Sequence, residues 1–115
     1  AFKGVWACYY ANSDPTRTVY AVDPDQGFID KISQLGRVTG TPNMVARQGA
    51  LGAKSRNATF SQARRFGLNL YDHSSGKRYY DHAFRIFRID ELFEKEALGL
   101  LHLDVEGHEA QALEG

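Results

Sequence analysis

Apolar and polar residues near the start of the chain follow first a helical spacing and then a strand-like one. The stretch GVWACYYAN, from Gly4 to about Asn12, places its apolar residues at helical spacing. Asp14-Pro15 closes this stretch, since proline cannot extend a helix. The following segment TVYAVD, residues 18–23, is rich in β-branched and aromatic residues. The pattern therefore predicts a helix followed by a short buried strand.

A second helix is predicted directly after this strand. Pro24 stands where a first helical turn would begin, and Asp23 or Asp25 can serve as its N-cap. Gly36 is expected to end the helix. The apolar stripe of this helix consists of Phe28, Ile29, Ile32 and Leu35.

The rest of the chain alternates in the same way. It predicts, in order, a turn at 38–42, strands at 43–51 and 57–62, a turn at 74–77, a strand at 83–89, a short helix capped by Asp90, a strand at 98–105 and a helix after Gly107. No internal repeat or linker divides the chain, so we expect one domain over residues 1–115. Alternating helices and strands are typical of an α/β fold with a mainly parallel sheet flanked by helices.

Composition limits the partners that this domain can have. The 14 basic and 14 acidic residues cancel, which argues against nucleic acid or an anionic membrane surface as a partner. No apolar run approaches the roughly 20 residues of a membrane span. The single cysteine, Cys8, cannot form an internal disulfide, which suits a reducing compartment. We therefore expect a soluble, cytoplasmic protein with a small or neutral partner.

The two ends of the sequence suggest a larger parent domain. The chain opens at Ala1 without a methionine, and it stops at Gly115 inside a predicted helix. We expect it to be part of a longer protein.

Acidic residues stand at the ends of two predicted strands. In an open parallel sheet, ligands bind beyond the carboxyl ends of the strands. Asp23 ends the first strand, where a carboxylate can accept hydrogen bonds from both hydroxyls of a ribose. This favours an adenosine-containing ligand. The alternative is that Asp23 only caps the following helix.

Asp104 and Glu106 follow the last predicted strand at a spacing of two, which would place both on one face. Burying two like charges together is costly, so we expect either a partner or a raised pKa for one of them. One of the two acids is then a candidate proton acceptor. Alternatively, Glu106 has already left the strand and caps the helix after Gly107. A metal site built on His102 and Asp104 is a weaker hypothesis, because a two-residue match is unspecific.

Four segments together resemble the FkbM-type methyltransferases. They are VYAVDPD at 19–25, RQGALG at 47–52, FRIDELF at 87–93 and LDVEGHEAQALEG at 103–115, the last close to the family's Asp-x-Glu-Gly-x-Glu signature. The resemblance implies an incomplete Rossmann-like domain that lacks its first strand and its C-terminal strands. It also implies methyl transfer from S-adenosylmethionine to a hydroxyl of a sugar or secondary metabolite.

The resemblance also implies roles for individual residues. Asp23 would bind the cofactor ribose, and Gly4 resembles the final glycine of the cofactor loop. Asp104 and Glu106 would face the methyl group and the acceptor, which is a small molecule or a glycan. For this to hold, Asp23 and the Asp104/Glu106 pair must meet at a common edge of the sheet.

Two other functions remain open. An acid after the second strand of a Rossmann-like fold suits NAD(P) equally well, which allows an oxidoreductase. A noncatalytic interaction module is the third possibility.

Overall fold

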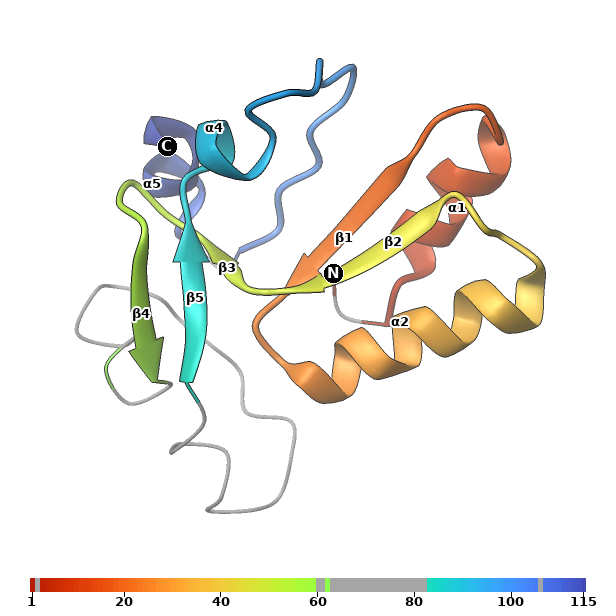
Figure 1. The fold of residues 1–115 in the computed structure, drawn as a ribbon, viewed down its shortest axis with the longest axis horizontal. Helices are drawn as coiled ribbons and strands as arrows, with labels where there is room; N and C mark the ends of the chain where they lie inside the picture. Colours follow the sequence, from red (N-terminus) through yellow and green to blue (C-terminus); the bar gives the residue numbers. More distant parts are fainter. Residues whose placement is uncertain (2, 60–61, 63–82, 106) are drawn as a thin grey trace. The chain divides into compact units, whose positions relative to one another are not determined.

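The computed structural model describes residues 1, 3–59, 62, 83–105 and 107–115. These residues form two compact units, Ala1–Gln48 and Gly49–Gly115 (Figure 1). Each unit has its own small sheet and its own apolar cluster. None of the helices in the described part of the chain has the length and apolarity needed to cross a membrane.

The first unit is a helix followed by a β-α-β arrangement. Its elements are α1 (Val5–Ser13), β1 (Val19–Asp23), α2 (Gln26–Thr39) and β2 (Met44–Gln48). The two strands are parallel, with Val19 opposite Met44 and Asp23 opposite Gln48. Parallel neighbours require a crossover, and α2 supplies it. The carboxyl ends of β1 and β2 therefore lie at the same edge.

The apolar stripe of α2 forms the core of this unit. Ile29 and Ile32 of α2 are buried with Ala21 of β1, and the partly buried residues Ala7, Met44 and Ala46 pack against them. Ile32 has no exposed surface at all. The predicted helices over Gly4–Asn12 and after Pro24 and the predicted strand at 18–23 are confirmed.

The helix α2 ends later than predicted. It runs through Gly36 to Thr39, and Gly40 then adopts a left-handed conformation with φ 64°. The Thr41 amide donates to the Gly36 carbonyl at 2.9 Å, and the Gly40 amide donates to the Arg37 carbonyl at 3.3 Å. This pair of bonds is the Schellman motif, which satisfies the last carbonyls of a helix. Gly40, not Gly36, is therefore the residue that stops α2, and the predicted turn at 38–42 begins too early.

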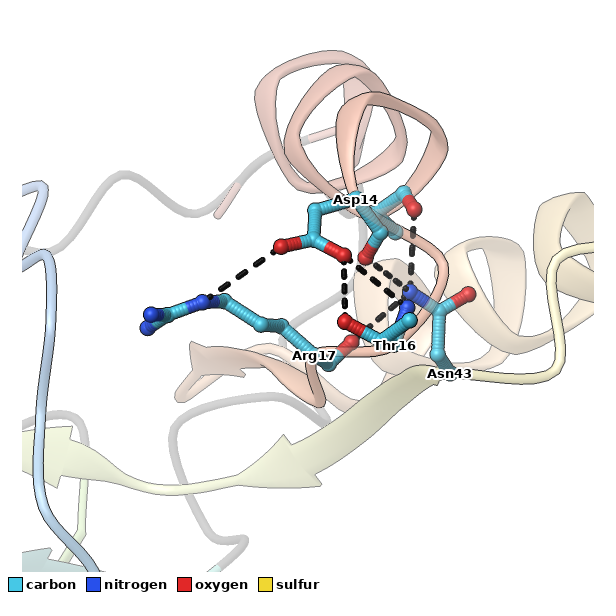
Figure 2. Close-up of polar contacts among 5 residues, drawn as sticks. Asp14, Thr16, Arg17 and Asn43 are labelled. Atoms are coloured by element: carbon cyan, nitrogen blue, oxygen red, sulfur yellow. Dashed lines mark hydrogen bonds and ion pairs between the residues drawn. The ribbon is translucent and has the colours of Figure 1, made fainter.

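The loop between α1 and β1 is tied to the start of β2 by Asn43 (Figure 2). The Asn43 side-chain amide donates to the carbonyl of Arg17 at 2.8 Å and to that of Asp14 at 3.4 Å. Asp14 Oδ1 accepts hydrogen bonds from the hydroxyl and the amide of Thr16, and its other oxygen lies 3.5 Å from Arg17 Nε. The Thr16 hydroxyl, the Thr16 amide and then Arg17 lower the pKa of Asp14.

The second unit contains a small mixed sheet. Its described elements are β3 (Ala50–Leu51), β4 (Arg56–Thr59), β5 (Ala83–Phe87), α4 (Ile89–Leu92) and α5 (Glu109–Glu114). The sheet order is β3-β5-β4, with β3 parallel and β4 antiparallel to β5. Leu51, Ile89 and Ala112 form its buried cluster, and the partly buried residues Leu92, Phe93 and Leu103 pack on it. The α/β class is confirmed, but the sheets are small and the pairing in this unit is mixed.

Two expectations for strands need correction. The segment 43–51 is not one strand: it is divided into β2 and β3 at Gly49, whose φ is 157°. The segment 98–105 is not a strand at all. Apolar sequence becomes a strand only when its amide and carbonyl groups pair with a neighbour, and this segment has no strand partner among the described residues.

The start of α4 also differs from the prediction. Its N-cap position is Arg88, so Asp90 lies inside the first turn and does not cap it. No side chain caps this helix, and the amide of its N-cap residue, Arg88, donates to the Ser55 hydroxyl at 3.0 Å. The predicted helix after Gly107 is confirmed as α5. The predicted turn at 74–77 lies outside the described residues.

Candidate functional site

Asp23 is the last residue of β1, and its carboxylate is held by the loop that follows the strand. Its Oδ1 accepts from the Asp25 amide at 2.9 Å. Only 13% of the Asp23 side chain is exposed. Its carboxylate is therefore oriented by the Asp25 amide, at the edge of the sheet where parallel strands bind ligands.

Asp25, not Asp23, caps α2. The Asp25 side chain accepts from the amides of Gly27 at 2.7 Å and Phe28 at 3.3 Å. It is only 5% exposed. These two bonds satisfy amides that the first turn of a helix leaves without partners. The capping alternative for Asp23 is therefore wrong, while its role toward a ribose stays a prediction.

Gly4 occupies a position that accepts no other residue without strain. It precedes α1 with φ 77°, a left-handed conformation that L side chains rarely adopt. A Cβ on Gly4 would stand 2.8 Å from Ile32 Cγ1. The missing side chain thus lets the start of α1 approach α2 closely.

Gly4 and Asp23 belong to the same unit, at the start of α1 and at the end of β1. Their meeting at one cofactor stays a prediction.

Gln48 is a residue of this site that the sequence analysis missed. It ends β2 directly opposite Asp23, and its side-chain Nε2 donates to the Pro24 carbonyl at 3.2 Å. The only sequence signal was a polar residue at the end of a strand, within the segment RQGALG. That signal is weak, because it does not reveal which strand lies beside β1.

The second unit carries Asp104, which is exposed and precedes a tight turn. The His108 amide donates to the Val105 carbonyl at 3.2 Å, and Gly107 within the turn has φ 90°. Glu109 Oε1 accepts from the Val105 amide at 3.0 Å. Main-chain amides, first its own and then that of Val105, lower the pKa of Glu109. The turn after Asp104 is thus closed by both main-chain and side-chain bonds.

His108, whose amide closes this turn, is only 5% exposed. Its Nδ1 atom is buried and has no hydrogen-bond partner among the residues that the structure describes. Within the same residues, no three His, Cys, Asp or Glu side chains gather closely enough to hold a metal ion. The histidine is therefore packed in the second unit beside Gly52, where an added Cβ would lie 3.8 Å from Nε2.

The predicted acid pair is only partly described. Asp104 does not end a strand, so the expectation that strand geometry aligns it with its neighbour is wrong. Glu106 lies outside the described residues. Asp23 belongs to the first unit and Asp104 to the second, so their meeting at one edge stays a prediction.

Comparison with known proteins points to one family. A family model described as the methyltransferase FkbM domain matches residues 1–115. No curated protein and no solved structure matches the chain.

Proposed function

The chain belongs to the FkbM family of methyltransferases, and from this premise we propose that it transfers a methyl group from S-adenosylmethionine to a hydroxyl oxygen. The acceptor is a small molecule or a glycan, such as a sugar or a secondary metabolite. Asp23 binds the cofactor ribose. Asp104 accepts the proton of the acceptor hydroxyl, and Glu106 orients the acceptor.

The observation that carries the cofactor role is the place of Asp23 at the carboxyl end of β1, in a parallel pair of strands, with its Oδ1 held by the Asp25 amide at 2.9 Å. It supports the proposal because a ligand binds beyond the carboxyl ends of parallel strands, and the same unit offers Gly4, with φ 77°, at the start of α1. A nucleoside site needs these two parts: a carboxylate for the ribose hydroxyls and a glycine that allows close approach of the backbone. The residues present fit an adenosine-containing cofactor.

When bound, S-adenosylmethionine supplies a methyl group on a positively charged sulfur. The chain's own task is then mainly to align the acceptor oxygen with the methyl carbon, because alignment lowers the barrier of a displacement. The acceptor hydroxyl must also lose its proton as the new bond to carbon forms. A carboxylate within hydrogen-bonding reach can accept that proton.

Asp104 is our first choice for this base, with Glu106 as an orienting partner. Asp104 is exposed and so accessible to an acceptor, and the amide of the next residue, Val105, donates to Glu109 Oε1 at 3.0 Å. The reverse assignment, with Glu106 as the base, is the alternative that the same experiments distinguish.

Calorimetry of the full-length protein with S-adenosylmethionine tests the cofactor role. Asp23→Asn removes the charge of an acid that would accept two hydroxyl bonds, so the dissociation constant should rise about 10- to 100-fold. The control is Asp30→Asn, an exposed acid on α2, which should bind as the wild type does. NAD is the competing ligand: binding of NAD but not S-adenosylmethionine would favour the oxidoreductase.

Single-turnover methyl transfer tests the acceptor role. Asp104→Asn should lower the rate about 10²- to 10⁴-fold, the usual worth of general-base catalysis, with cofactor affinity unchanged. Glu106→Gln should lower the rate of methyl transfer by a smaller factor if Glu106 only orients the acceptor. Glu94→Gln, at an exposed position, is the control. Equal rates for Asp104→Asn and the wild type would remove Asp104 from the mechanism.

A further inference from the structure

We propose that Gln48 is a positioning residue of the cofactor site: its side-chain amide fixes the peptide that orients the Asp23 carboxylate. This inference rests on the proposed role of Asp23 and assigns a specific task to a neighbouring residue on β2.

The register of the two parallel strands brings Gln48 within reach of the loop after β1. Asp23 and Gln48 are paired opposite each other as the last residues of β1 and β2. Adjacent strands lie about 4.8 Å apart, so a side chain as long as glutamine can reach the loop that leaves the neighbouring strand. That loop is Pro24-Asp25, which leads into α2.

The peptide group between Pro24 and Asp25 is held at both of its ends. Its carbonyl belongs to Pro24 and accepts from Gln48 Nε2 at 3.2 Å. Its amide belongs to Asp25 and donates to Asp23 Oδ1 at 2.9 Å. A peptide group is planar and rigid, so fixing the direction of the carbonyl also fixes the direction of the amide. Gln48 thereby aims the Asp25 amide at Asp23.

The other bonds of this loop do not replace Gln48. The Asp25 side chain binds the amides of Gly27 and Phe28, which anchors the loop to α2 beyond the peptide in question. Rotation of the Pro24–Asp25 peptide about its flanking bonds would turn its amide away from Asp23. The half-buried Gln48 side chain opposes this rotation from the neighbouring strand.

The test compares two replacements of Gln48 in the full-length protein. Gln48→Met keeps the length of the side chain and removes the donor. Calorimetry should show a dissociation constant for S-adenosylmethionine raised about 2- to 10-fold, the range expected for one lost hydrogen bond. Gln48→Lys retains a donor of similar reach and should bind more tightly than Gln48→Met. Gln34→Met, at an exposed position on α2, is the matched control and should bind normally.

A second measurement needs no cofactor. Hydrogen exchange of the Asp25 amide, followed by NMR, should accelerate in Gln48→Met and remain unchanged in Gln34→Met. General loosening of the fold would instead accelerate the buried amides of α2 as well, including that of Ile32. Steady-state kinetics should show a raised KM for S-adenosylmethionine with kcat and the acceptor KM unchanged.

The outcomes separate this inference from the proposed function. If the wild type does not bind S-adenosylmethionine, the proposed function fails and the cofactor part of this inference fails with it. If the wild type binds and Gln48→Met binds equally well, the function stands and the inference is wrong. An unchanged exchange rate at Asp25 would also overturn it, whatever the affinity.

Discussion

Gly4 and Ile32 meet in the first unit so closely that a Cβ on Gly4 would stand 2.8 Å from Ile32 Cγ1. This relationship joins the start of α1, where the predicted cofactor loop ends, to the most buried side chain of α2. The geometry of the candidate cofactor site and the stability of its unit therefore depend on the same contact.

Gly4→Ala should destabilise the protein by about 2–5 kcal/mol. Left-handed backbone with a Cβ costs about 1–2 kcal/mol, and overpacking against Ile32 adds about 1–3 kcal/mol. Gly40→Ala is the matched control, because Gly40 also has a positive φ but no atom lies within 4 Å of its Cβ position. Urea denaturation should show a loss of only about 1–2 kcal/mol for the control. Equal losses for both variants would mean that the contact with Ile32 contributes nothing.

Ile32→Ala should destabilise by about 2–5 kcal/mol, because it removes buried methyl groups and leaves a cavity. Ile32 has no exposed surface, whereas Val38 on the same helix is 78% exposed. Val38→Ala should therefore change the free energy of unfolding by less than about 0.5 kcal/mol. Thermal and urea unfolding of the two variants measure the difference.

Asp25→Ala should lower the free energy of unfolding by about 0.5–2 kcal/mol, the usual loss when a helix N-cap is removed. Asp25→Asn keeps an oxygen that can accept from the Gly27 and Phe28 amides, so it should retain most of this energy. Denaturant unfolding gives the comparison. If Asn and Ala destabilise equally, the acceptor oxygen is not the source of the stabilisation.

Thr16→Val should raise the pKa of Asp14 toward its ordinary value of 3.8, because the Thr16 hydroxyl is the first cause of the lowering. NMR titration of the Asp14 carboxyl group measures the shift. The Thr16 amide and Arg17 remain, so the pKa should stay somewhat below the ordinary value. Thr18→Val, at an exposed neighbouring position, should leave the titration unchanged.

The direction of the pH effect follows from this lowered pKa. A carboxyl whose pKa is lower in the folded state contributes stability above its unfolded value and loses it as pH falls through the folded value. The wild type should therefore exceed Thr16→Val in stability at neutral pH. The difference should shrink as pH falls below 3.8 and disappear once the Asp14 carboxyl is protonated in the folded protein. A difference that persists at still lower pH would have to come from packing of the threonine methyl group.

Local patterns predicted those parts of the chain whose structure depends on near neighbours. The helix α2 combines an acidic cap, a proline just before that cap and an apolar stripe, all within one segment, and it forms as expected. Its end was misplaced because the glycines at 36 and 40 look alike in sequence. Only the bonds from Gly40 and Thr41 back into the helix distinguish the two.

The prediction for residues 98–105 failed for a different reason. Leu98, Leu100 and Leu101 are apolar but exposed, and the segment finds no strand beside it in the described part of the chain. Pairing between strands joins residues far apart in sequence, so an apolar run alone cannot establish it. Asp104 is also exposed, and it too belongs to this segment without a neighbouring strand among the described residues.

Patterns within short stretches of the chain were enough to predict the α/β class, the family resemblance, the helices α1, α2 and α5, the strand β1, and the acid at its end. Each of these depends on spacing, caps or motifs between near neighbours. Only the tertiary structure shows that Gly4 lies against Ile32, that Asp25 rather than Asp23 caps α2, and that Gln48 donates to the Pro24 carbonyl. These contacts depend on which strands and helices become neighbours in space, and burial of the whole core selects those neighbours rather than any one segment.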